Sequence, residues 1–304
     1  MAKRGFFFDL SDGIENNANV HREIIRQIER LTKRNLVCYV ANPGHPGGAL
    51  QDHDPDLLEN ILRSLKLQLY NNKLDLLVNS PGGFPYAAGK MVKVCKSMSA
   101  DFRTFVLGRA MSAATLLCLG SQELIMSSTA SLGPIDPQMV TSSARGQRLV
   151  PAHVIIDSFR QMIAASQEAI LAKRPPDPFF RVLDSLDTTA VFESIKAVES
   201  TKTIAKELLV NGLLRASPEK IDTAVNTLMA EGEKEFHGKH LYPDAVQSQI
   251  GLPVTVLKVG EPLDLKLREL FVRIEVYANA KGVAKYIVTR EGGIDVNIVA
   301  RPIS

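Results

Sequence analysis

The sequence predicts an α/β fold built on a mostly parallel central sheet. Short apolar segments that fit buried strands alternate along the first half of the chain with segments whose apolar residues have a helical period. Strands separated by helices pair in parallel through right-handed crossovers. The 304 residues, of which 45% are hydrophobic and 23% charged, suit one large globular domain with a smaller addition.

The expected elements of the first half follow one another as helix and strand. We expect buried strands at residues 36–41, 74–78, 103–107 and 123–126. We expect helices at residues 21–34, 55–69, 86–98 and 112–119. Asp54 is the expected N-cap of the second of these helices.

The second half is predicted to be mostly helical. Residues 151–231 have helical spacing, interrupted at 174–180 by three prolines, and residues 254–259 fit a last strand of the main body. The Glu261-Pro262 pair then marks a boundary, followed by a helix to about residue 280 and strands near 286–289 and 294–299. We therefore divide the chain into an N-terminal arm (1–17), a main domain (18–260) and a C-terminal helix-strand appendage (261–304).

Composition excludes several classes of function. The net charge is +3 with both signs mixed along the chain, so no nucleic-acid-binding face is indicated. The three cysteines lie in apolar runs, which indicates reduced thiols. No segment is long and apolar enough for stable insertion into a membrane, and we expect a cytoplasmic protein. The sequence has no metal-ligand spacing and no G-x-x-x-x-G-K-[ST] motif, so we expect no metal, no other cofactor and no ATP site.

Two glycine-bearing motifs follow neighbouring predicted strands. NSPGG (79–83) follows the strand at 74–78, and GRAMSAA (108–114) follows the strand at 103–107 and begins a helix of small residues. Both motifs are thus expected at the carboxyl ends of parallel strands, where α/β sheets bind their ligands.

The contents of the two motifs predict acyl-transfer chemistry. Ser112 at a helix start is the candidate nucleophile, and the amide of Ala113 is an unpaired donor of the helix terminus. Adjacent glycines allow a close backbone approach, so the amide of Gly83, or alternatively Gly82, is the second oxyanion donor. Either motif alone is also explained by an ordinary turn and an ordinary helix cap.

NSPGG followed by the serine of GRAMSAA, 32 residues after Ser80, resembles the ClpP/crotonase superfamily. The continuation ELIMSSTASLGPIDPQM (123–139) is most similar to the serine dehydrogenase proteinases, in the branch that contains signal peptide peptidase A and the stomatin-operon partner protease. The resemblance covers roughly residues 18–260. It implies a ClpP/crotonase-like fold of repeated ββα units and a serine peptidase that acts on polypeptides. It also implies a substrate cleft that includes Ser80 and Asp136, the latter as a polar contact.

The sequence offers two candidates for the residue that activates Ser112. The histidine that ClpP-like enzymes place about 25 residues after the serine is missing here, because that stretch reads Pro137-Gln138. In the stomatin-partner type a lysine about forty residues after the serine serves as base. His153 occupies that position here, with Asp157 one helical turn later to orient it. Lys173 is the alternative base, provided that the proline-rich loop folds back over the site.

Three hypotheses of function follow. The first is an ATP-independent serine endopeptidase with a Ser112 acyl-enzyme and a Ser-His or Ser-Lys dyad. The second is a catalytically degenerate oligomeric scaffold or sensor, and the third is a crotonase-type acyl-CoA enzyme, which the serine at position 112 disfavours. We also expect a homo-oligomer, since the helix at 265–280 carries Leu267, Leu270, Phe271 and Ile274 on one face. That face can dock on another subunit or on the core of its own chain.

Overall fold

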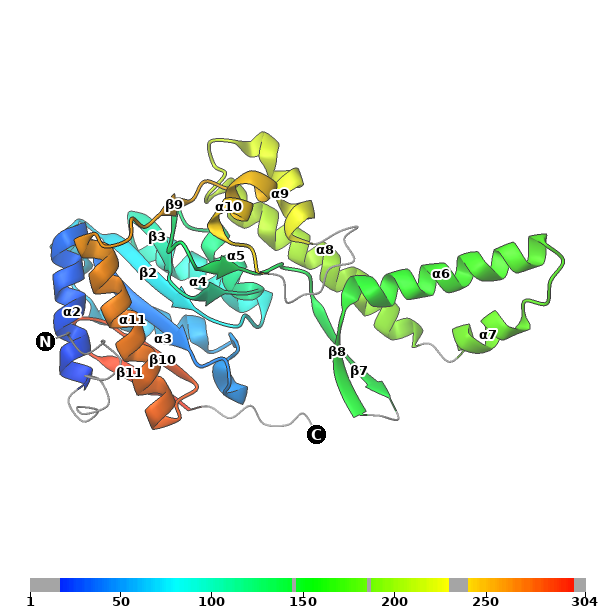
Figure 1. Ribbon diagram of the computed structural model, residues 1–304, viewed down its shortest axis with the longest axis horizontal. Helices are drawn as coiled ribbons and strands as arrows, with labels where there is room; N and C mark the ends of the chain where they lie inside the picture. Colours follow the sequence, from blue (N-terminus) through cyan, green and yellow to red (C-terminus); the bar gives the residue numbers. More distant parts are fainter. Residues whose placement is uncertain (1–16, 144–145, 185–186, 230–239, 298–304) are drawn as a thin grey trace, which may run out of the picture.

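A seven-stranded sheet runs through the body of the protein in the order β11-β10-β1-β2-β3-β5-β9 (Figure 1). We describe a computed structural model of the chain over residues 17–143, 146–184, 187–229 and 240–297. The parallel part comprises the following strands: β1 (Asn35–Ala41), β2 (Lys73–Asn79), β3 (Asp101–Val106), β5 (Glu123–Met126) and β9 (Thr255–Val256). The predicted α/β class with a mostly parallel sheet is therefore confirmed.

Both faces of the sheet are buried. Along β1, Val37 and Tyr39 belong to one hydrophobic core, and Leu36, Cys38 and Val40 belong to a second core on the other face. Successive side chains of a strand point to opposite faces, so a strand covered on both sides is apolar throughout. The three cysteines are buried free thiols, as predicted.

Helices cover the two faces of the sheet. One face carries α3 (Asp54–Ser64), α4 (Pro85–Met98) and α5 (Ala113–Leu119), and the other carries α2 (Asn17–Thr32) and α11 (Pro262–Lys281), which pack together. The apolar face predicted on the last helix lies within this chain, since Leu267, Leu270 and Ile274 are fully buried. It is therefore not available to dock on another subunit.

The C-terminal segment extends the sheet. Strands β10 (Lys285–Val288) and β11 (Gly293–Val296) continue it antiparallel beside β1. Lys285 is fully buried, and its ammonium contacts both carboxylate oxygens of Asp54, at 2.9 and 2.7 Å. Asp54 also accepts hydrogen bonds from the Tyr39 hydroxyl and the Gln51 amide. Asp54 is thus the first residue of α3 and a buried partner of β10 rather than the predicted N-cap, a position that His53 occupies.

A second, smaller layer lies at the carboxyl ends of β2 and β3. Strand β4 (Arg109–Ala110) pairs in parallel with β6 (Ser131–Leu132), and isolated bridges join Ala110 to Ser80 and Leu132 to Leu241. Because this layer connects both glycine-bearing motifs, it places them next to each other.

An arm projects from the body (Figure 1). It consists of a hairpin, β7 (Gln138–Ser143) and β8 (Gly146–Pro151), followed by α6 (Ala152–Leu171), α7 (Asp177–Asp184) and the first turns of α8 (Thr188–Val210). The predicted helices and the break between them are confirmed here, whereas the hairpin was not predicted. Short helices η4 (Pro218–Lys220), α9 (Ile221–Leu228), α10 (Pro243–Ala245) and η5 (Val246–Ile250) complete the body, with η2 (Pro46–Gly48) and η3 (Leu67–Tyr70) in the first half.

None of the helices in the described ranges combines the length and the apolar character needed to cross a membrane. The predicted N-terminal arm falls almost entirely on residues 1–16, which lie outside the described residues.

Candidate active site

Ser112 has an unusual backbone conformation immediately before α5. Its φ of 50° and ψ of −117° are the values of the first central residue of a type II′ turn, a position that glycine dominates. The side chain makes no capping hydrogen bond to the helix that it precedes. Ser112 is therefore not an ordinary helix cap. Its hydroxyl lies at a strained strand-to-helix turn of the kind that presents a nucleophile.

The Gly82-Gly83 turn packs directly against Ser112. A Cβ built on Gly82 would lie 2.7 Å from Cβ of Ser112 and 3.3 Å from the amide nitrogen of Ala113. Only glycine allows this approach. Ser80, which is buried, accepts a hydrogen bond from the Gly82 amide at 3.2 Å. Ser80 thus holds the turn in place, and the Gly82 amide is already used within the loop.

Gly83 lies against Leu50 on its other side. Leu50 donates its amide to the Gly82 carbonyl at 2.7 Å, and Phe84 donates to the Leu50 carbonyl at 3.0 Å. In a parallel bridge of this kind the N–H of the central residue points to the opposite side. The Gly83 amide consequently faces away from Leu50. Within the described ranges neither this amide nor that of Ala113 donates a hydrogen bond.

His153 lies beside Asp136. It is the second residue of α6, and its Nδ1 is buried, has no hydrogen-bond partner among the described residues and lies 3.9 Å from Oδ2 of Asp136. Asp136 is buried and accepts a hydrogen bond from Gln138 at 3.2 Å. A separation of 3.9 Å exceeds a hydrogen bond, but such pairs are often long in the unliganded state of an enzyme.

Two predicted residues lie elsewhere. The Asp157 carboxylate is exposed and lies 3.7 Å from Arg160, whereas the carboxylate observed beside Nδ1 of His153 is that of Asp136. Lys173 is exposed just beyond the far end of α6. At 1.5 Å of rise per residue it lies about 30 Å from His153. The proline-rich loop does not fold back, and Lys173 stays remote from Ser112 of the same chain (Figure 1).

Backbone contacts connect the His153 pair to the Ser112 turn. A Cβ on Gly133 would lie 3.1 Å from Cα of Met111, the residue before Ser112, and Asp136 follows three residues later. The Ala152 amide donates to the Pro137 carbonyl at 2.9 Å, which fixes the start of α6 beside Asp136. The segment from Gly133 to Ala152 thus runs from the residue before Ser112 to the start of α6, which carries His153.

Sequence reasoning missed Thr115. Its buried hydroxyl lies 2.8 Å from the carbonyl oxygens of Ala110 and Gly133 and accepts the Gly133 amide at 3.1 Å. It therefore ties α5 to the ends of both short strands. The role of Leu50 was missed as well, because a single bridge inside a loop leaves no periodic signal.

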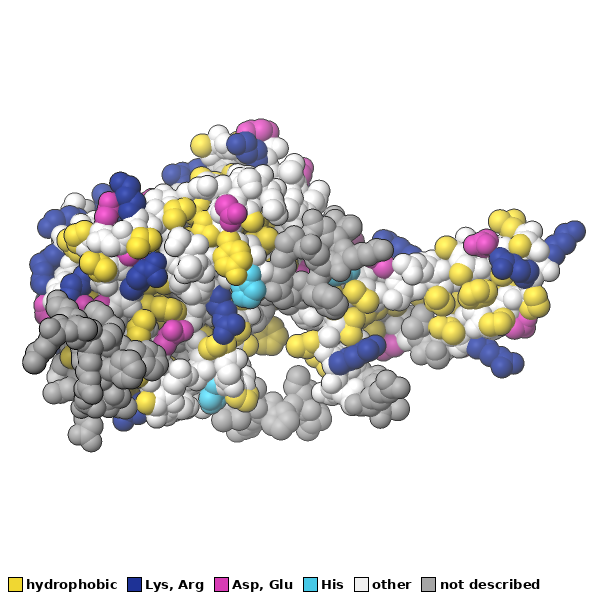
Figure 2. Space-filling view, viewed as in Figure 1, with side chains coloured by type: hydrophobic (Ala, Val, Ile, Leu, Met, Phe, Trp, Pro, Cys, Tyr) yellow, Lys and Arg dark blue, Asp and Glu magenta, His cyan; other side chains and the backbone are white. Residues whose placement is uncertain are grey.

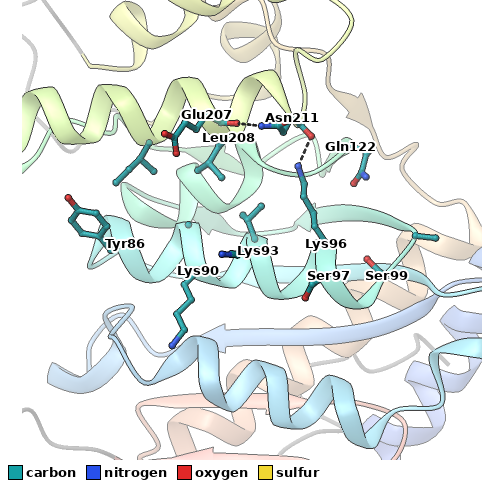
Figure 3. Close-up of a pocket in the computed structure, with 14 residues that line it drawn as sticks. Tyr86, Lys90, Lys93, Lys96, Ser97, Ser99, Gln122, Glu207, Leu208 and Asn211 are labelled. Atoms are coloured by element: carbon teal, nitrogen blue, oxygen red, sulfur yellow. Dashed lines mark hydrogen bonds between the residues drawn. The ribbon is translucent and has the colours of Figure 1, made fainter.

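A groove of about 940 Å³ between α4 and α8 is a different feature (Figure 3). Lys96 donates to the carbonyl of Asn211 at the end of α8, and Lys90 points out of the groove to Asp56. Cations at the carbonyl end of a helix stabilise it. These polar groups serve packing, and the groove contains none of the predicted site residues.

The described residues contain no group of three or more His, Cys, Asp or Glu side chains that could hold a metal ion.

Comparison with known proteins finds a family match over part of the chain. Residues 50–171 match the family model of ClpP-like SDH-type serine proteinases. The family resemblance predicted from the sequence is confirmed. The matched segment contains the glycine turn, Ser112, Asp136 and His153, and it ends before Lys173.

Two curated relatives come from Methanocaldococcus jannaschii. Over 81 residues, 27% of this chain and 28% of the relative, the chain is 38% identical to the uncharacterized protein MJ0137. Over 196 residues it is 29% identical to the uncharacterized protein MJ1495, which covers 62% of this chain and 61% of the relative. The chain thus spans less than two thirds of either relative.

A solved structure of a membrane-bound stomatin-specific protease, a mutant in complex with a substrate peptide, is also similar. The TM-score is 0.42 at 14% identity, over 70% of this chain and 73% of that one.

Proposed function

We propose that this protein is an ATP-independent serine peptidase with Ser112 as its nucleophile. The proposal depends above all on the Ser112 turn, where a hydroxyl free of capping lies at a strained backbone position beside two amides that donate to no described group. In the reaction, Oγ of Ser112 attacks the peptide carbonyl, the amine leaves, and water hydrolyses the resulting acyl-enzyme.

The oxyanion donors are the amides of Gly83 and Ala113. The geometry favours Gly83 over Gly82, because the Gly82 amide is bonded to Ser80. Each donor aimed at the developing negative charge stabilises the transition state by about 3 kcal/mol. Polypeptide is the substrate class that this chemistry and the family resemblance suggest.

His153 is the proposed base, with Asp136 as the residue that orients it. With Nδ1 turned toward Asp136, Nε2 is left to accept the proton of Ser112 and to return it to the leaving amine. A carboxylate at this place stabilises the imidazolium that forms after the first proton transfer. We assign this role to Asp136 because it is buried and lies 3.9 Å from Nδ1 of His153, whereas the Asp157 carboxylate is exposed.

The first experiment is labelling with a fluorophosphonate followed by peptide mapping. We expect a single adduct on Ser112, together with hydrolysis of a casein-derived peptide mixture, and loss of both in Ser112→Ala. An adduct on another serine, or undiminished hydrolysis by Ser112→Ala, would refute the assignment. A folded parent protein that neither reacts nor cleaves would favour the scaffold hypothesis.

The base is tested by four substitutions. His153→Gln should lower turnover by about two to four orders of magnitude, and Asp136→Asn should lower it as well, whereas Lys173→Met and Asp157→Asn should change it little. The last two are matched controls that remove the same kinds of charge from the arm. If Lys173→Met is inactive while His153→Gln is not, the base is the lysine, supplied by another copy of the chain.

We further propose that copies of the chain associate through the arm. Large apolar side chains are exposed along it: Val140, Leu149, Val154, Ile170, Leu171, Phe180, Val182 and Phe192 (Figure 2). No residue of α7 is buried. Exposed apolar surface of this extent is typical of an interaction site, and the arm replaces the α11 face as the expected subunit contact.

A further inference from the structure

A cavity of about 340 Å³ lies between the small strand layer and α11. Ala110, Leu132 and Leu241 of that layer point into the hydrophobic core. Because side chains alternate along a strand, their neighbours face the other way, and Arg109, Ser131, His240 and Tyr242 line the cavity. Phe271 and Glu275 of α11 form the opposite wall.

The histidine of the cavity is held in place. Nδ1 of His240 lies 2.7 Å from Oγ of Ser131, and its ring is stacked on that of Tyr242 with centroids 6.3 Å apart. Nε2 is thereby left for a ligand. This pair is not a second nucleophilic site, since the amides of residues 131, 132 and 133 all donate to backbone carbonyls and none remains for an oxyanion.

Two opposite charges line the cavity without pairing. Within the described ranges neither Arg109 nor Glu275 forms a side-chain hydrogen bond or an ion pair within 4.0 Å. Other charged groups of α11 do pair, Arg268 with Asp264 at 2.7 Å and Arg273 with Glu269 at 3.3 Å.

The carboxylate of Glu275 is also partly desolvated. Burial raises the pKa of Glu275 above its usual value, and the positive charge of Arg109 opposes that rise. The two groups therefore influence each other across the cavity while neither neutralises the other directly. A desolvated charge without a partner is costly, and a ligand with the opposite charge relieves that cost.

We infer that this cavity binds a free α-amino acid with an apolar side chain. The ligand carboxylate pairs with Arg109 and its ammonium group with Glu275, so each end forms a charge-assisted interaction. Its side chain packs on the rings of Phe271 and Tyr242, and His240 Nε2 supplies a further polar contact. A volume of 340 Å³ is at the low end for ligand pockets and suits a molecule of this size. Asn79, Gly108 and Arg109 of the two glycine-bearing motifs line the cavity, but Ser112, Gly82 and Gly83 do not. The inference does not require that the protein be a peptidase.

Isothermal titration with L-leucine tests the inference on the full-length protein. Two analogues dissect the charges: 4-methylpentanoate lacks the ammonium group and 3-methylbutylamine lacks the carboxylate. We expect leucine to bind about tenfold or more tightly than either analogue, since each lost charge-assisted contact is worth at least that factor.

Two variants locate the binding. Glu275→Gln should remove the preference for leucine over 4-methylpentanoate, and Arg109→Met should remove the preference over the amine. Glu219→Gln and Arg148→Met delete the same charges at exposed positions away from the cavity and should bind leucine like the parent. Thermal unfolding of each variant confirms that it is folded. The inference is overturned if leucine does not bind, if all three ligands bind alike, or if the two cavity variants keep the parent's affinity and preference.

Discussion

Replacement of Ser112 by glycine is expected to stabilise the fold while it abolishes activity. The strain at Ser112 comes from its φ of 50° and ψ of −117°, which a side chain bearing Cβ rarely adopts and glycine adopts readily. Alanine at the same position retains the Cβ and hence the strain, and it removes only the hydroxyl. The difference in stability between Ser112→Gly and Ser112→Ala therefore measures the cost of the backbone conformation at this position.

The magnitude follows from two opposing contributions. A residue held in such a region costs about 1–3 kcal/mol, which glycine relieves. Glycine also gains freedom in the unfolded chain, which lowers stability by about 0.5–1 kcal/mol. The net expectation is that Ser112→Gly is more stable than Ser112→Ala by about 1 kcal/mol. Because the Ser112 side chain makes no cap bond, Ser112→Ala itself should stay within about 0.5 kcal/mol of the parent.

Urea unfolding followed by circular dichroism measures the difference, with equal slopes as the check on two-state comparison. Ser217 is the matched control, because it too precedes a short helix without a cap bond, but with a φ of −144°. There Gly should be less stable than Ala by about 0.5–1 kcal/mol. If the Gly variant is less stable than the Ala variant at position 112, as expected at position 217, Ser112 is not strained and the reasoning fails.

Three further predictions concern the Gly82-Gly83 turn, a buried histidine and the arm. Gly83→Ala should destabilise the fold by about 2 kcal/mol or more in thermal unfolding, because its Cβ would lie 2.2 Å from a backbone oxygen. Gly146→Ala is the control: Gly146 has a φ of 102° but open space around it, so alanine there introduces only backbone strain. Equal losses would show that the close approach is unimportant. Burial lowers the pKa of His21 from 6.5 to about 4. Because the unfolded chain binds the proton more readily, the free energy of unfolding is highest above pH 6.5 and falls as the pH drops toward 4. Between pH 7 and pH 5, the free energy of unfolding measured in urea should therefore fall by about 2 kcal/mol less in His21→Leu than in the parent. An unchanged pH dependence would contradict this. Leu171→Ser, at the most exposed apolar position of the arm, should weaken self-association in sedimentation velocity, and a monomeric parent would contradict the proposed contact.

The parallel sheet and the two glycine motifs were predictable because their signals are local. A buried strand is apolar throughout, and the strand-turn-helix order alone places the turns at one edge of the sheet. The Lys285–Asp54 pair was not predictable, since its partners are 231 residues apart and each is unremarkable in its own segment. The same holds for β10, whose pairing with β1 converts a predicted appendage into part of the sheet.

The candidate site was predictable only in part, for a related reason. Helical spacing favoured Asp157 as the partner of His153. On an exposed helix, however, side chains one turn apart can both point into solvent instead of toward each other. The observed neighbour, Asp136, comes from a loop that reaches His153 through the Pro137–Ala152 hydrogen bond. The distance of Lys173 from the site was not predictable, because no local signal in a sequence gives the direction in which a helix leaves the body.

The small residues around Ser112 explain how the fold keeps it in a strained conformation. Met111 donates its amide to the Ser80 carbonyl at 3.0 Å and accepts the Ala114 amide at 2.9 Å, so the backbone before and after the serine is fixed on both sides. Thr115 then joins the helix to both short strands.

Any Cβ on the glycines that press on this turn would collide with it. At Gly82 the nearest atom is the Met111 carbonyl oxygen at 2.6 Å, and at Gly133 it is the Met111 side chain at 2.8 Å. A strained residue persists only where its surroundings leave it no alternative, and here three separate segments of the chain do so. Gly82, which precedes the proposed oxyanion donor, and Gly133 therefore also hold the serine in position. Substitution of either glycine is expected to affect both stability and activity.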